Sequence, residues 1–127
     1  MKTIIKTDKA PAPIGPYNQA VEVNGMLFVS GQVAIDPATG DLVMDTIQNE
    51  THRVMKNIQA VLSHAGYDLS MVVKTTIFLS DMNLFAEVNE IYGSYFTSDF
   101  PARETVAVKG LPKGVNVEIS VTAAKVA

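Results

Sequence analysis

Two segments of the chain have the apolar spacing of an α-helix, and strand-like segments lie before and after each of them. Residues 46–65 carry apolar side chains three and four positions apart, and residues 83–97 repeat this spacing with aromatic side chains. Because strand–helix–strand units join strands that run in the same direction, this order predicts a single sheet with some parallel pairing. Both helices are expected on one face of that sheet, and no further helix is predicted to cover the other face.

Six segments have the composition or the alternation of β-strands. The clearest is residues 115–123, where apolar and polar residues alternate, so one face is expected to be buried. Asn24 and Gly25 favour a tight hairpin turn between the second and third strands. The unbroken apolar run at residues 26–29 predicts an interior strand that is covered on both faces. The predicted strands are residues 2–6, 19–23, 26–35, 72–79, 103–108 and 115–123.

Capping and turn residues mark the ends of these elements. Asp45 and Gln48 predict a capping box at the start of the first helix, and Gly66 predicts its end. Three prolines within residues 10–16 predict an extended, ordered loop. No repeat or linker divides the sequence, so residues 1–127 are expected to form one domain.

Composition limits the compartment and the partners. The chain has no cysteine, which excludes a disulfide scaffold and a thiol nucleophile. Its net charge of −3 makes nucleic acid an unexpected partner. No apolar stretch reaches membrane-spanning length, and lysines interrupt the start of the chain, so we expect a cytoplasmic protein without a membrane partner. Only 18% of residues are charged, which suggests that self-association buries the sheet face without helices.

The sequence offers little for metal or cofactor chemistry. His52 and His64 are twelve residues apart on the first helix, so we expect two surface histidines rather than a metal site. The glycines match neither a phosphate-binding loop nor a dinucleotide fingerprint, so no cofactor is expected. The turn at residues 109–114 carries two lysines, and we interpret it as a plain turn rather than an anion site.

A small polar set remains as a candidate pocket. Arg103 begins a strand just after Pro101, and arginine is the natural partner of a carboxylate. Glu118 is the only charged residue of the last strand, and glutamate can hold or deprotonate a water molecule. Tyr17 and the Ser30–Gly31 pair lie at the ends of rigid segments. The alternative is that Arg103 and Glu118 are exposed strand residues that pair with each other.

The chain resembles the Rid family, also called the YjgF family, and is most similar to its RidA branch. Each matching motif is weak alone, but their order and spacing across the whole chain are specific. The motifs lie at residues 12–17, 29–32, 73–79, 85–89, 100–103, 111–113 and 117–119.

This resemblance implies an α+β, chorismate-mutase-like fold, with two helices on one face of a six-stranded mixed sheet. It also implies a homotrimer with clefts between subunits. The implied activity is hydrolysis of reactive 2-enamine and 2-imine acids, which pyridoxal-phosphate enzymes release, to 2-keto acids and ammonia. Neither a metal nor a cofactor is implied.

The resemblance also assigns roles to individual residues. Arg103 would hold the substrate carboxylate, Glu118 would position water, and Tyr17 would complete the catalytic set. Many relatives carry cysteine two residues after the arginine, where this chain has Thr105. The remaining positions implied in substrate binding are Ser30, Gly31, Phe85, Asn89 and Thr105.

Three other functions stay open at this stage. The same pocket would suit a non-catalytic trimer that binds 2-keto acids or regulates another protein. RNA cleavage is attributed to some relatives, but the acidic charge argues against it. Chorismate mutase is supported by fold alone, which is a poor guide to function.

Overall fold

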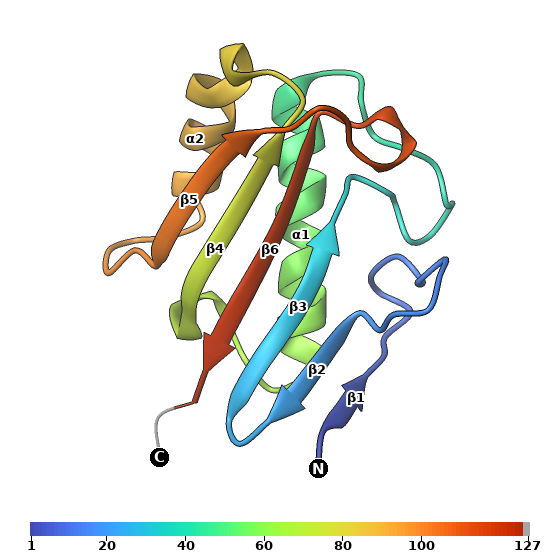
Figure 1. Ribbon diagram of the computed structural model, residues 1–127, viewed down its shortest axis with the longest axis vertical. Coiled ribbons are helices and arrows are strands. Elements are labelled where there is room, and N and C mark those ends of the chain that lie inside the picture. Colours follow the sequence, from blue (N-terminus) through green and yellow to red (C-terminus); the bar gives the residue numbers. More distant parts are fainter. Residues whose placement is uncertain (126–127) are drawn as a thin grey trace.

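Six strands form one mixed sheet and two α-helices lie against one of its faces, as Figure 1 shows for the computed structural model, which describes residues 1–125. Short 3-10 turns occur at Leu69–Met71, Met82–Leu84 and Pro112–Gly114. The main elements are β1 (Thr3–Ile5), β2 (Ala20–Val23), β3 (Met26–Gln32), α1 (Ile47–His64), β4 (Val72–Leu79), α2 (Phe85–Gly93), β5 (Ala102–Ala107) and β6 (Val117–Ala124).

The strand order is β1-β2-β3-β6-β4-β5, which confirms the predicted mixed sheet. Strands β4 and β5 are parallel and are joined through α2, whereas the other neighbours are antiparallel. Strand β6 lies between β3 and β4 and pairs antiparallel with both, so β3 and β4 run in the same direction. The last strand of the chain therefore occupies the centre of the sheet.

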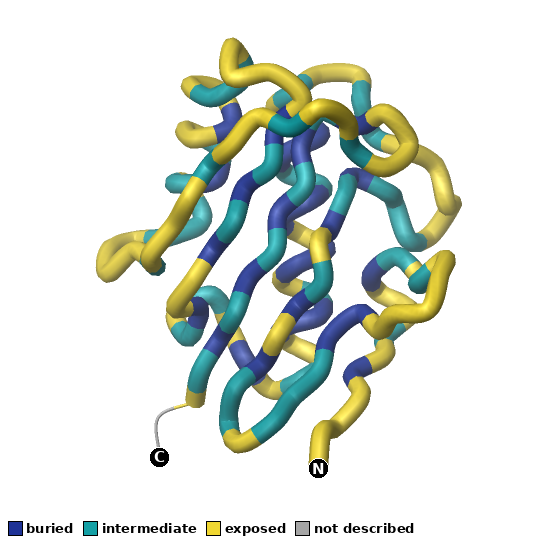
Figure 2. The backbone as a smooth tube through the Cα atoms, viewed as in Figure 1, coloured by how far each residue is buried: buried dark blue, intermediate teal, exposed yellow. Residues whose placement is uncertain are grey.

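The core lies between the sheet and the two helices. The apolar stripe of α1 is buried from Val54 to Leu62, and along β6 buried residues alternate with less buried ones (Figure 2). Val117, Ile119, Val121 and Ala123 face the helices, as the alternation predicts. Burying such side chains contributes about 1.5–3 kcal/mol each, so this interface accounts for much of the fold's stability.

The predicted ends of two elements need correction, whereas the hairpin between β2 and β3 does not. The Asn24–Gly25 hairpin is confirmed by positive φ angles of 50° and 76°. Strand β3, however, ends at Gln32 rather than at residue 35. The reason is that Asn57 Nδ2 on α1 donates hydrogen bonds to the carbonyl oxygens of Val33 and Ile35, which would otherwise pair with a neighbouring strand. Helix α2 covers only part of the predicted range 83–97, since a 3-10 turn precedes it and it ends at Gly93.

The start of the first helix also differs from the prediction. Thr46 is the N-cap, and its hydroxyl accepts from the backbone N–H of Asn49 at 3.0 Å. The Asp45 carboxylate instead accepts from the side-chain amide of Asn49, so Asp45 and Gln48 do not form the predicted capping box. Gly66 does follow the helix end, and its φ of 83° confirms the predicted stop.

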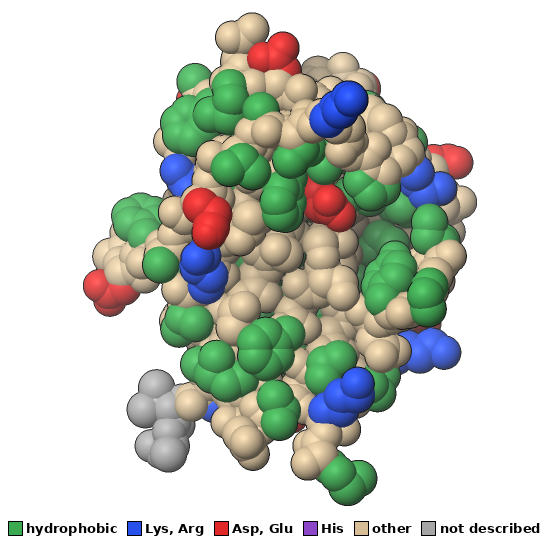
Figure 3. All heavy atoms as spheres, in the orientation of Figure 1, with side chains coloured by type: hydrophobic (Ala, Val, Ile, Leu, Met, Phe, Trp, Pro, Cys, Tyr) green, Lys and Arg blue, Asp and Glu red, His purple; other side chains and the backbone are tan. Residues whose placement is uncertain are grey.

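The second face of the sheet carries no helix within residues 1–125 and is the face turned to the viewer in Figures 1 and 3. Hydrophobic side chains form separate patches on it, over the strands and along both edges (Figure 3). Phe28 is 46% exposed there, so the interior strand β3 is covered on one face only in the single chain. Lys74 and Glu104 form an ion pair of 3.0 Å near the β5 edge. No helix among the described residues is both long and apolar enough to span a bilayer.

Candidate functional site

Arg103 lies on the edge strand β5 and its side chain reaches toward α2. Strand β5 pairs in register with β4, with Arg103 opposite the buried Thr75, so both side chains face the helices. The guanidinium Nη1 donates to Asn89 Oδ1 at 2.7 Å. Its Cζ lies 5.6 Å from the Phe85 ring centre and 5.4 Å from that of Tyr92. An amide and two aromatic faces therefore hold this cation in one orientation.

An open pocket of about 400 Å³ lies beside this arginine. Asn89, Tyr92, Phe100 and Arg103 contribute to its lining. Asn89 takes one side of the guanidinium, which leaves the other N–H groups to bind a carboxylate or another planar anion.

Thr105 shares the helix-facing side of β5 with Arg103, as the strand alternation predicts. Its Oγ1 is buried and has no hydrogen-bond partner within the described chain. Glu104 faces the other way and pairs with Lys74. Thr105 thus presents a hydroxyl without a partner two positions from Arg103, and it does not line the pocket itself.

Glu118 lies in a second cavity, of about 80 Å³, on the opposite face of the sheet. Tyr17, Gly31, Lys113 and Glu118 are among the residues that line it. Burial raises the pKa of the Glu118 carboxyl above its usual value. A carboxylate with a raised pKa is suited to exchange a proton with a bound water molecule.

Gly31 is essential to the position of the Glu118 side chain. A Cβ atom at residue 31 would lie only 2.5 Å from Glu118 Oε2. Gly31 lies where the β3–β6 register shifts between Val29 and Gln32, so the local irregularity brings backbone and carboxylate together. The structure thus gives this glycine a steric role toward Glu118, and the approach of a ligand to its backbone stays a prediction.

Ser30 and Tyr17 have different surroundings. The Ser30 hydroxyl donates to the carbonyl of Asn18 at 2.6 Å, so within the single chain it holds the preceding loop. Tyr17 is 49% exposed and lines the Glu118 cavity. The structure brings Tyr17, Gly31 and Glu118 together, with Ser30 adjacent through the backbone.

Sequence reasoning missed two residues that shape this cavity. Gln19 is buried, and its amide bonds to the backbone of Thr7, Ala10 and Pro11, which confirms that the proline-rich loop is ordered. Lys113 lines the cavity with a φ of 57°, although the turn that carries it was interpreted as plain. The single sequence signal for Gln19 was its polar side chain at the start of a predicted strand.

Arg103 and Glu118 lie on opposite faces of the same sheet. Arg103 lies opposite Thr75, which faces the helices, whereas Glu118 lies opposite Phe78 on the uncovered face. The alternative in which they pair with each other is therefore wrong for a single chain. Each chain presents two separate half-sites, one with Arg103, Phe85 and Asn89, the other with Glu118, Tyr17 and Gly31.

The histidines do not form a third site. His64 is exposed, as predicted, whereas His52 is only partly exposed and its Nδ1 lies 2.7 Å from the Tyr95 hydroxyl. Within residues 1–125, no group of three histidine or acidic side chains is placed to hold a metal ion.

Comparison with known proteins identifies the family. A family model described as endoribonuclease L-PSP matches residues 7–125. A RutC family protein of Pyrococcus horikoshii is 49% identical over 125 residues, covering 98% of this chain and 99% of that protein. The mouse protein named 2-iminobutanoate/2-iminopropanoate deaminase is 47% identical over 123 residues, covering 97% of this chain and 91% of that protein.

A solved structure agrees with these sequence matches. The crystal structure of RidA from an Antarctic Psychrobacter has a TM-score of 0.93 and 39% identity, covering 97% of this chain and 99% of that one. The sequence matches and the shared fold thus agree over nearly the whole length. The chain belongs to the Rid family, also called the YjgF family.

Proposed function

We propose that the protein hydrolyses reactive 2-enamine and 2-imine acids, such as 2-iminobutanoate and 2-iminopropanoate, to 2-keto acids and ammonia. The observation that carries this proposal is the pair of half-sites, an oriented arginine and a half-buried glutamate with a raised pKa. The name of the mouse relative describes this reaction. An anion-binding group and a proton-exchanging group are the two functions that such a hydrolysis requires.

The chemistry of the substrate sets a modest demand on the protein. The C=N carbon of a 2-iminium acid is already electrophilic, so orientation and one positioned base give most of the rate enhancement. Arg103 binds the carboxylate, with Phe85 as an apolar wall and Asn89 fixing the guanidinium. Tyr17 and Gly31 line the cavity where Glu118 directs a water molecule.

The proposed reaction proceeds in two proton transfers at Glu118. The water oxygen bonds to the C=N carbon as Glu118 takes one water proton. Glu118 then returns this proton to the nitrogen and the C–N bond breaks. The remaining hydroxyl proton leaves with ammonia as ammonium, which generates the keto group. The raised pKa of Glu118 suits a group that both accepts and donates this proton.

A complete site requires more than one subunit, because the two half-sites lie on opposite sheet faces. We propose a homotrimer in which Arg103 of one subunit and Glu118 of its neighbour border the same cleft. The exposed apolar side chains of the uncovered face, including Phe28, would be buried in this assembly.

The first experiment couples the protein to a threonine dehydratase and measures release of 2-ketobutyrate in competition with a rapid imine trap. Arg103→Ala should abolish the acceleration, and Glu118→Ala should lower kcat more than it raises KM. Lys109→Ala, which removes an exposed cation outside both half-sites, serves as the matched control and should keep full activity. An Arg103→Ala protein as active as wild type would refute the proposed function.

A second experiment tests whether the site is shared between subunits. Arg103→Ala chains, expected to be inactive, and Glu118→Ala chains, expected to have a lowered kcat, are unfolded, mixed in equal amounts and refolded, and the activity is compared with that of each variant refolded alone. In a cyclic trimer, random mixing restores an intact Arg103–Glu118 pair at about one quarter of the clefts, one half multiplied by one half. A mixture that forms mixed trimers but gains no activity over the variants refolded alone would show that each site belongs to one chain.

The unpartnered hydroxyl of Thr105 favours a second candidate function. A side chain that differs from the common cysteine, and that has a free hydroxyl, suits a trimer that binds 2-keto acids without turning over imines. Measurable 2-ketobutyrate binding with no acceleration in the coupled assay would support this binder. RNA incubated with the protein provides a further check on the family description, and the net charge of −3 predicts no salt-dependent binding.

A further inference from the structure

One acidic side chain is completely buried in the helix layer. Glu50 lies in the first turn of α1 and has no exposed surface. Its Oε2 accepts from the backbone N–H groups of Asn116 at 2.8 Å and Val117 at 3.2 Å. Its Oε1 accepts from the side-chain amide of Asn116 at 2.9 Å. Neither ion pair among the described residues includes Glu50, so these three hydrogen bonds are what compensate its burial.

The two residues that Glu50 holds come directly before Glu118. The β3–β6 register ends at Gln32 opposite Ile119, so Val117 and Glu118 lie beyond the last pair with β3. On the other side, β4 pairs with both residues. Glu50 therefore replaces the missing β3 contacts at the start of β6.

We propose that Glu50 is a positioning residue, which fixes the backbone at residues 116–117 and thereby sets where the Glu118 carboxylate lies. The inference rests on the proposed deaminase function, because it requires Glu118 to act on a substrate. Val117 faces the helices and Glu118 faces the uncovered side, so the coupling passes through the backbone of β6. A carboxylate on one face of the sheet thus aligns a carboxylate on the other.

The reach of the Glu50 side chain matters more than its charge. Aspartate is shorter by one C–C bond, about 1.5 Å, and cannot reach both backbone N–H groups from the same helix position. Glutamine has the same length as glutamate, so its side-chain oxygen can still accept from both backbone N–H groups. The Asn116 amide can rotate by half a turn and present its oxygen to the glutamine nitrogen. In the wild-type structure the Ser80 hydroxyl donates to Asn116 Oδ1 at 3.1 Å. After the rotation the same hydroxyl can accept from the Asn116 amide nitrogen instead.

The experiment compares kcat and KM of wild type, Glu50→Asp and Glu50→Gln in the dehydratase-coupled assay with 2-iminobutanoate. Since a 1 Å displacement can cost about 100-fold in rate, we expect Glu50→Asp to lower kcat at least about tenfold. Its KM and its affinity for 2-ketobutyrate should stay within about twofold, because Arg103 lies on β5 and does not contact Glu50. Glu50→Gln should keep a kcat close to that of wild type.

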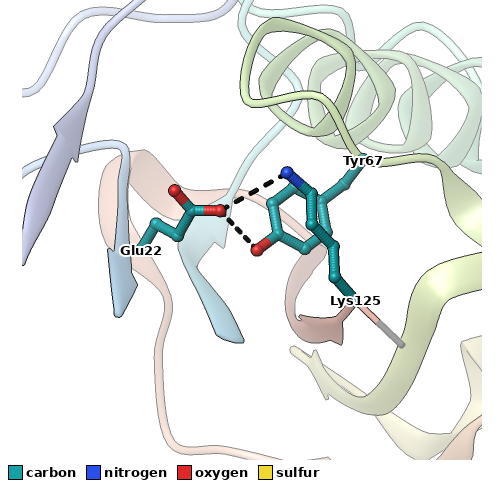
Figure 4. A network of polar contacts seen from close by, with 3 residues as sticks. All are labelled: Glu22, Tyr67 and Lys125. Carbon is teal, nitrogen blue, oxygen red and sulfur yellow. Dashed lines mark hydrogen bonds and ion pairs between the residues drawn. The ribbon is translucent and has the colours of Figure 1, made fainter. Parts of the chain in front are cut away.

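A matched control lies near the opposite end of β6, beside the β2–β3 hairpin. There Tyr67 donates to Glu22 Oε2 at 2.5 Å, and Lys125 Nζ lies 3.7 Å from the same oxygen (Figure 4). Tyr67→Phe removes a hydrogen bond to a carboxylate, as Glu50→Asp does, but next to the β2–β3 hairpin. It should lower the melting temperature and leave kcat unchanged.

Three results would overturn the inference. They are wild-type kcat in Glu50→Asp, an equal loss of kcat in Glu50→Gln, and an equal loss in Tyr67→Phe. If Glu50→Asp fails to fold, Asn116→Ala removes the side-chain bonds of Asn116 to Glu50 and to Ser80 and keeps the two backbone bonds to Glu50, and an unchanged kcat there also refutes the positioning role. An inactive wild type, by contrast, refutes the proposed function itself, and an active wild type with an unaffected Glu50→Asp refutes this inference alone.

Discussion

Gly31→Ala isolates the position of the Glu118 carboxylate from the stability of the fold. The φ angle of Gly31 lies outside the left-handed region, so the backbone accepts alanine without strain. The new Cβ would lie 2.5 Å from Glu118 Oε2 and 2.8 Å from Cδ. The three atoms nearest to the methyl group all belong to the Glu118 side chain and none to the backbone, so we expect Glu118 to move and the sheet to stay in place.

The size of the effect follows from these distances. Ordinary contact requires about 3.5 Å, so the carboxylate must shift by about 1 Å. A shift of that size costs about 100-fold in rate, or about 2.7 kcal/mol of transition-state stabilisation. The rotamer change that allows it costs about 0.5–1.5 kcal/mol of stability. Activity should therefore fall much more than the free energy of unfolding.

Steady-state kinetics in the coupled assay and a thermal melt of the same preparation test this prediction. Gly110→Ala is the matched control, because nothing lies within 4 Å of a Cβ at that exposed position, and it should match wild type in both measurements. Wild-type kcat in Gly31→Ala would refute the reasoning. A loss of kcat matched by an equally large loss of folding free energy would refute it too.

Two further predictions concern Glu118 and Gln19. Burial raises the pKa of Glu118 in the folded state above its value in the unfolded chain, so folding is more favourable when Glu118 is protonated. This contribution to stability is fully present below the unfolded pKa and is lost as the pH rises through the folded pKa. Glu118→Gln should thus melt at a higher temperature than wild type at pH 7, with the difference disappearing below about pH 4; an equal gap at both values would contradict this. Gln19→Ala should cost about 1–3 kcal/mol of stability through its lost bonds to the loop backbone. Hydrogen exchange should then accelerate at the Thr7 amide but not in α1, and uniform acceleration would be the contrary result.

Much of the fold was predictable because its signals are local. The spacing in α1 and the alternation in β6 identify buried faces without knowledge of the partner element. The errors occur where a side chain distant in the sequence forms hydrogen bonds with the backbone. Asn57, for example, donates to two carbonyl oxygens just after β3. Such competition between strand and helix partners has no signature within a short window of sequence.

The candidate site was predicted as a set of residues but not as a geometry. Alternation along residues 103–108 agrees with the structure, which has Arg103 and Thr105 on one face of β5 and Glu104 on the other. It did not reveal that Arg103 and Glu118 face opposite sides of the sheet. The anchors Gln19 and Glu50 were also missed, since their partners lie up to 67 residues away in the sequence.

The sequence by itself determined which residues alternate and where the two helices lie, and it supplied the set of candidate site residues. Only the tertiary structure decided which face of each strand meets the helices. The reason is that a period of two defines two faces for every strand, whereas the register between strands settles how those faces align. In this protein the pairing of Thr75 with Arg103 and of Phe78 with Glu118 places the two half-sites on opposite faces of one sheet, which is the reason that we propose a shared site between subunits.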